Sequence, residues 1–101
     1  MASIEEEFRN KGILRGRTLH FRPEDAIAVV RRCRERGIAI HGIDGFIITE
    51  HVTQPVMEQS MDLSDIASLR NPIDCWDRAE RFLEDRRASD LYFEIVTGEH
   101  D

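Results

Sequence analysis

The run from Gly37 to Glu50 constrains the fold most, because it is the densest apolar stretch of the chain and contains no Lys or Arg. Its three glycines disfavour a helix, and its β-branched isoleucines favour a pleated sheet. Positions of both parities are apolar, which is typical of a central strand that is covered on both faces. We therefore predict one central strand that bends at Gly42 and Gly45. A hairpin that turns at Asp44-Gly45 is the alternative.

Two segments have the features of amphipathic helices. Pro23 suits the first position of a helix and Gly37 suits its C-cap, with acids in the first turn and arginines near the end, as the helix dipole favours. Asn71 and Pro72 are predicted to cap and open a second helix. Apolar residues recur every three or four positions in both segments: Ala26, Val29, Val30 and Cys33 in the first, and Cys75, Trp76, Ala79, Phe82 and Leu83 in the second.

The other elements have weaker signals. Residues 91–96 alternate as a final strand, and Val56–Met61 is predicted to be a short strand that returns beside Phe46–Thr49. Thr53–Pro55 is predicted to be a connection, because proline cannot join an inner ladder. The remaining expectations are a single helical turn within residues 62–69, a short helix within residues 4–11 capped by Ser3, and a loop or short edge strand within residues 13–21.

Length and composition indicate one globular domain. A chain of 101 residues, 41% apolar and 34% charged, is long enough for one core and unlike a disordered segment. We expect a single α+β domain over residues 1–101, with two main helices packed on a small mixed sheet and with residues 1–22 left without an assigned place. There is no secretory signal at the N-terminus and no apolar run near the roughly 18 residues of a membrane span. We therefore expect a cytoplasmic protein without membrane contact.

The net charge of -6 is unevenly distributed. Residues 1–36 hold nine Lys or Arg and six Asp or Glu, whereas residues 37–69 hold five acids and no base. Such a block repels nucleic acid and attracts basic surfaces. We predict a partner-binding segment whose acids are Glu50, Glu58, Asp62 and Asp65. The segment also contains Met57 and Met61, whose side chains adapt to irregular surfaces; the alternative is a solvated loop whose acids keep the protein soluble.

The chain has no recognisable motif for catalysis, metal binding or cofactor binding. Its four histidines lack a third ligand at the spacing of a zinc site. Cys33 and Cys75 fall on apolar stripes, where a thiol stays protonated and unreactive. We expect no catalytic residue, no metal and no cofactor. The enzyme alternative is a cleft formed by His41, His51 and Asp44.

Four short motifs follow one another along the chain: Gly42-Ile-Asp-Gly-Phe46, Asp62-Leu-Ser64, Trp76 with Ala79 and Phe82-Leu83, and Tyr92-Phe-Glu-Ile-Val96. In their order and spacing they resemble small bacterial immunity proteins of polymorphic toxin systems, most like the family called immunity protein 40. The resemblance covers roughly residues 23–97.

This resemblance implies an α+β domain that is not an enzyme, and that binds and neutralises a toxin domain made by the same cell or its kin. It carries over no catalytic residues. Together with the charge distribution, it leads us to expect an inhibitor of a cognate, basic toxin. The alternatives are the small enzyme and a homodimeric scaffold that pairs its edge strand with a second copy.

Overall fold

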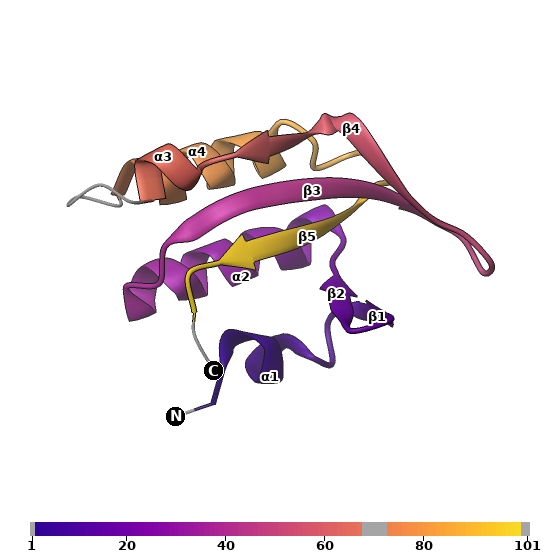
Figure 1. The fold of residues 1–101 in the computed structure, drawn as a ribbon, viewed down its shortest axis with the longest axis horizontal. Helices are drawn as coiled ribbons and strands as arrows, with labels where there is room; N and C mark the ends of the chain where they lie inside the picture. The colour runs from indigo at the N-terminus through magenta and orange to yellow at the C-terminus, as the bar shows by residue number, and fades with distance from the viewer. Residues whose placement is uncertain (1, 68–72, 100–101) are drawn as a thin grey trace.

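The computed structural model describes residues 2–67 and 73–99, which form both helices and strands (Figure 1). The elements are α1 (Ile4–Phe8), β1 (Ile13–Arg15), β2 (Thr18–His20), α2 (Pro23–Arg36), β3 (Ile40–Ile48), β4 (Thr53–Asp62), α3 (Ser64–Ala67), α4 (Ile73–Glu84) and β5 (Tyr92–Thr97). This combination of helices with antiparallel sheets confirms the α+β class.

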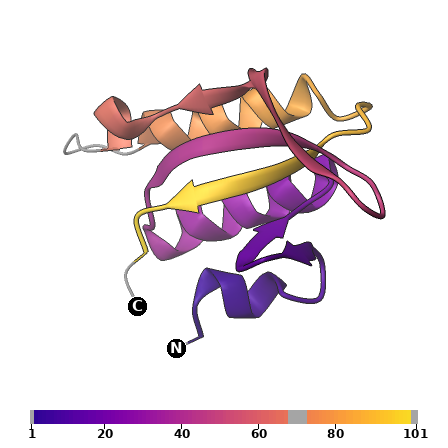
Figure 2. The same cartoon turned by 45° about the vertical axis from the view of Figure 1, so that its right-hand side comes forward.

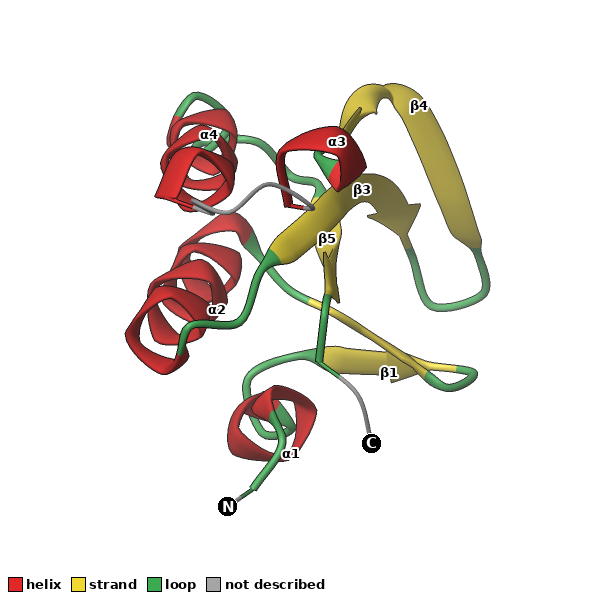
Figure 3. Ribbon diagram, turned by 60° about the vertical axis from the view of Figure 1, so that its left-hand side comes forward, coloured by secondary structure: helices red, strands yellow, loops and turns green. Residues whose placement is uncertain are grey.

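Two layers form the main body of the molecule. The helices α2 and α4 lie side by side in one layer, and the strands β4, β3 and β5 form the other (Figures 1 and 3). Ile43 and Phe93 of the sheet and Leu83 of α4 are fully buried in the core. β3 occupies the centre of the sheet and runs without a break through Asp44 and Gly45, so the prediction of one central strand is confirmed and the hairpin alternative is wrong.

All pairings within this sheet are antiparallel, so the expectation of a mixed sheet is wrong. A short turn at residues 49–52 returns the chain from β3 directly into β4. After α4, the chain enters β5 at the end of β3 where Tyr92 pairs with Phe46, and it runs back until Thr97 pairs with Ile40. The direction of β5 therefore depends on the route of α4 across the sheet, which no local sequence signal encodes.

The helix α2 begins and ends as predicted. Pro23 occupies its first turn, and Gly37 closes it in the left-handed conformation with φ of 69°. The amide of Gly37 donates to the carbonyl of Arg34, which satisfies an acceptor that the helix end leaves unpaired. The predicted apolar stripe is buried: Ala26, Val29, Val30 and Cys33, together with Ile27.

The helix α4 buries the predicted stripe against α2 and β3. Cys75, Trp76, Ala79 and Leu83 are buried, and Phe82 packs against them. The indole Nε1 of Trp76 donates a hydrogen bond of 2.8 Å to the carbonyl of Ile38. The predicted cap at Asn71 and Pro72 lies outside the described residues.

The strand β4 is longer than predicted. It extends from Thr53 to Asp62, so the expectation that Thr53–Pro55 forms a connection is wrong. Proline is tolerated here because β4 is the last strand of the order β4-β3-β5, where one row of backbone groups needs no partner strand. The short helical turn predicted after it is confirmed by α3.

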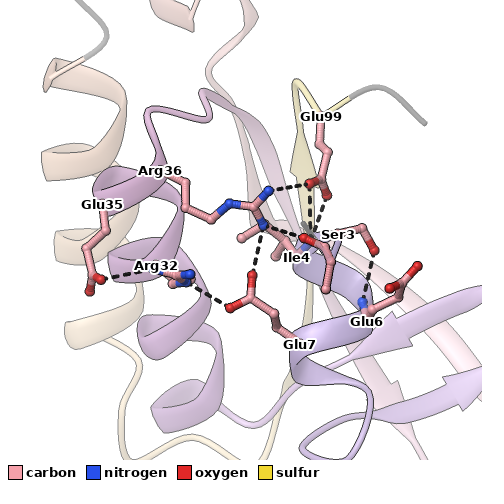
Figure 4. A network of polar contacts seen from close by, with 9 residues as sticks. Ser3, Ile4, Glu6, Glu7, Arg32, Glu35, Arg36 and Glu99 are labelled. Carbon is pink, nitrogen blue, oxygen red and sulfur yellow. Dashed lines mark hydrogen bonds and ion pairs between the residues drawn. The ribbon is translucent and has the colours of Figure 1, made fainter.

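The segment before α2 forms α1 and a small β1–β2 hairpin beside α2 and β5 (Figure 2). The short helix predicted within residues 4–11 is confirmed, and Ser3 caps it as predicted. An ion-pair network holds α1 in place (Figure 4). Glu7 accepts hydrogen bonds of 2.8 Å from both Arg32 and Arg36, and these arginines lower its pKa. Glu99 accepts a 2.9 Å hydrogen bond from the amide of Ile4 and pairs with Arg36 at 3.6 Å. Glu99 therefore serves the fold and is not free to meet a partner.

His20 is buried where the β1–β2 hairpin meets the sheet. It is only 2% exposed, and its ring packs edge-on against Phe46 with centroids 4.6 Å apart. Its Nδ1 atom has no hydrogen-bond partner among the described residues. Burial lowers the pKa of His20 below the ordinary value of 6.5, and the positive charge of Arg15 adds to this shift.

We expect the protein to lose stability as the pH falls below about 6.5, because the unfolded chain then takes up a proton that the folded His20 resists. His20→Leu should flatten this pH dependence in urea unfolding measured between about pH 5 and 7. The matched control is His51→Leu, which alters a histidine whose side chain is 86% exposed. One pH profile shared by both variants and the wild type would contradict the prediction.

Candidate partner-binding surface

β4 is the edge of the sheet that remains open among the described residues. The opposite edge, at β5, is partly occupied because Phe21 and Phe93 exchange two backbone hydrogen bonds of 2.8 and 2.7 Å. Beyond the core, the β3–β4 hairpin projects past the helical layer (Figures 1 and 2). The exposed edge and the projecting hairpin together form the surface on which the four predicted acids lie.

The four predicted acids are all exposed, but they form a line and not a cluster. Glu50 lies in the hairpin turn, Glu58 within β4, Asp62 at the end of β4 and Asp65 in α3. Asp62 pairs with Gly42 near the start of β3, and Glu50 follows its far end. At about 3.3 Å per residue of strand, these two carboxylates are on the order of 25 Å apart.

Three acids of this line, Asp62, Glu58 and Glu50, also differ in their surroundings. Asp62 accepts a 2.9 Å hydrogen bond from the amide of Ser64, and bonds from Ser64 lower the pKa of Asp62. It thus holds the start of α3 as well as adding charge. The side chain of Glu58 has no hydrogen bond or ion pair to any other described residue, and the carboxylate of Glu50 lies 4.0 Å from Nε2 of His51. Glu50 and Glu58 are therefore the acids of this line least committed to the fold.

The middle of β4 contains a wide bulge. Ile43 pairs with Met61 and Gly45 with Val56, so four residues of β4, numbers 57–60, stand opposite Asp44 alone. Sequence inspection predicted a bend at Gly45 but did not predict an insertion of this size in the partner strand. Bulges of this kind bend an edge strand and re-aim its side chains.

Several contacts fix the conformation of the bulge. The hydroxyl of Ser60 accepts from the amide of Gly45 and donates to the carbonyl of Val56, both at 3.2 Å. The Nε of Arg86 donates a 2.6 Å hydrogen bond to Gln59 Oε1, which ties the bulge to the turn that follows α4. Arg86 itself lies over the ring of Phe82, 3.7 Å from its centroid.

The bulge and the hairpin expose apolar side chains beside the acids. Met57 is 79% exposed, more than any other large apolar residue among those described, and Glu58 follows it directly. Val52 and Ile47, nearer the hairpin turn, are 46% and 45% exposed. A surface that combines exposed apolar groups with uncommitted acids has the chemistry of a protein-binding surface.

Two bases from other elements reach this surface, and both bind neutral oxygens. Arg15 of β1 donates to the carbonyl of Thr49 at 2.6 Å and to Thr53 Oγ1 at 3.4 Å, which braces the hairpin. Arg86 is held by Gln59 as described above. Neither arginine forms an ion pair with Glu50 or Glu58, and each brings one positive charge to this surface.

The pairing of β3 with β5 brings two further acids close together. Asp44 and Glu94 are paired residues on β3 and β5, so two carboxylates lie directly opposite each other. Burial, together with the charge of Asp44, raises the pKa of Glu94. Asp44 thus occupies a sheet position and contributes to an anionic field.

The cleft suggested for an enzyme is not formed. His41 and Asp44 do line one shallow depression of about 330 Å³, but His51 lies in the hairpin turn at the far end of β3. An extended strand separates its ends, so the two histidines are on the order of 25 Å apart. Three groups so placed cannot act on one substrate atom.

The two cysteines lie in the core, and no group of metal ligands is found in the described part of the chain. Cys33 and Cys75 are buried and form no disulfide, and the Sγ of Cys75 accepts a 3.4 Å hydrogen bond from the amide of Ile40. Burial raises the pKa of the Cys33 thiol to about 12, which keeps it protonated at neutral pH. Within residues 2–67 and 73–99, no three His, Cys, Asp or Glu side chains are grouped so that they could hold a metal ion.

The fold and this surface define a small α+β domain with a projecting, acidic sheet edge. Comparison of the sequence with protein-family models gave no match, and comparison with curated proteins gave none either. Of the helices in the described ranges, none has both the length and the apolar character that a membrane crossing requires.

Proposed function

We propose that this chain is an immunity protein that binds a basic toxin domain through β4 and the β3–β4 hairpin, and thereby inhibits the toxin. The observation that carries the proposal is β4 itself, an open sheet edge with exposed acids and exposed apolar side chains. The toxin as partner comes from the resemblance to the immunity protein 40 family, which the motifs between residues 42 and 96 carry.

Electrostatics would supply both speed and specificity in this mechanism. Residues 37–67 contain five acids and no base. A basic toxin surface would be steered toward them, and its own substrate would be excluded once the surface is covered. Inhibition of this kind requires no catalytic group, which is why no reaction is assigned to the chain.

The homodimer alternative is less well supported by β4. Strand pairing with a second copy needs a regular edge with free amides, whereas Pro55 lacks an amide hydrogen and the bulge at residues 57–60 interrupts the ladder. Two copies would also bring their acidic edges together, and like charges that lie opposite each other destabilise a pairing.

The test is reversal of the two uncommitted acids, Glu50→Lys with Glu58→Lys, measured against the protein encoded by the neighbouring upstream reading frame. We expect association to slow by about tenfold or more and the salt dependence of its rate to weaken, because steering charges act chiefly on the on-rate. Asp62 is left unchanged because it holds α3.

The matched control is Glu5→Lys with Glu24→Lys, which changes the net charge equally at exposed positions of α1 and α2. It should leave association near the wild-type rate. A Glu50/Glu58 variant that folds and neutralises the upstream product as the wild type does, with the same salt dependence, would overturn the proposed surface. No binding of the upstream product by the wild type would overturn the proposed function itself.

A further inference from the structure

Met57 is the most exposed large apolar side chain in the described part of the chain, and it lies at the bulge of β4. We infer that Met57 is the apolar anchor of the interface and enters an apolar pocket bordered by basic groups on the partner protein. This inference rests on the proposed function and names the chemistry of that partner's surface.

The first argument is pre-organisation. A flexible loop would lose conformational freedom on binding, whereas a side chain displayed from a fixed backbone loses less. Ser60 bonds to both Gly45 and Val56, and Gln59 is held by Arg86, so both strands and the turn after α4 determine the shape of the bulge. These contacts keep the side chain of Met57 exposed to water, so its apolar surface adds little to the stability of the fold.

The second argument is the form of contact that the edge allows. Pro55 and the bulge at residues 57–60 interrupt the row of backbone groups that an added strand would need. A partner must therefore meet β4 through side chains. Interfaces of that type depend on a few anchors that fill pockets, surrounded by contacts that exclude water.

The third argument is charge, which favours a basic protein over a second copy of this chain as the partner. Glu58 follows Met57 directly, and residues 37–67 contain no base. A second copy of this chain would bring the same acids and would be repelled, whereas a basic protein surface would be attracted. The thioether of methionine adapts to pockets of irregular shape, which suits an anchor at this position.

The test is Met57→Ala against the product of the neighbouring upstream reading frame, with Ile73→Ala as the matched control. Ile73 is also exposed, at 49%, but it lies on α4. We expect Met57→Ala to weaken the Kd by about 30-fold or more through faster dissociation, as for an interface hot spot, and Ile73→Ala to change it by less than about threefold. The salt dependence of association should stay as in the wild type, because no charge changes.

The outcomes separate this inference from the proposed function. If the wild type binds and Met57→Ala binds equally well, the anchor is wrong and the proposed function stands. If the wild type does not bind the upstream product, both are overturned. If the wild type is a dimer in solution that Met57→Glu dissociates, a second copy occupies this surface and the inference is wrong.

Discussion

Trp76→Ala is expected to destabilise the protein by about 3–5 kcal/mol, as truncations of large buried aromatic residues do. Trp76 is 7% exposed and packs in the core between α4 and the sheet. Its Nε1 donates to the carbonyl of Ile38 at 2.8 Å, and the guanidinium of Arg34 lies over its ring at 6.0 Å. Truncation would leave a cavity and would remove the hydrogen bond to Ile38, so two costs add.

Chemical unfolding followed by circular dichroism measures this loss, since Trp76 is the single tryptophan and its fluorescence disappears in the variant. Trp76→Phe is the matched control. It keeps most of the ring volume and loses the Nε1 donor, so it should cost less than the truncation to alanine. A Trp76→Ala protein with an unchanged melting temperature and no partner binding would instead place Trp76 at the interface.

The helices could be predicted from the sequence because their signals are local. Pro23 and Gly37 mark the ends of α2 by backbone preference alone, and each acts without help from distant residues. The buried stripe of α4 follows from a spacing of three and four residues. The isoleucines and glycines of β3 likewise identified a central strand, and its pairing registers shift next to Gly42 and Gly45.

The errors concern features set by residues far apart in the chain. The antiparallel direction of β5 depends on how α4 crosses the sheet. The place of α1 depends on Glu99, which bonds to Ile4 across 95 positions of sequence. The extension of β4 through Pro55 depends on β4 lying at the edge of the sheet. Proline is tolerated there because its missing amide hydrogen leaves no partner strand without a bond.

Only some features of the candidate surface could be predicted, because others depend on residues far apart in the chain. Composition located the acids, because the absence of bases between residues 37 and 69 is visible in the sequence. Nearness in sequence did not make them a cluster, since an extended strand places Glu50 and Asp62 far apart. The bulge could not be predicted, because the bond between Gln59 and Arg86 joins residues 27 positions apart.

Gly45→Ala is expected to destabilise the protein by about 1–3 kcal/mol, the usual cost of forcing extra atoms into a packed site. A Cβ at Gly45 would lie 2.9 Å from the Cβ of Gln59, and it would overlap the carbonyl oxygen of Gln59. Backbone cannot rotate away as the tip of a side chain can, so the bulge must shift as a whole. Its shift would also move Met57, so we expect weaker binding of the upstream product together with lower stability.

The matched control for this prediction is Gly98→Ala. Its added Cβ would lie 2.8 Å from Nε2 of His41, which is the far end of a side chain that can turn aside. We therefore expect Gly98→Ala to cost less than Gly45→Ala in thermal and urea unfolding, and to leave binding unchanged. A Gly45→Ala variant as stable as the wild type would mean that the bulge yields without cost. Met57 would then be displayed on a deformable segment, and pre-organisation would no longer explain its role as an anchor.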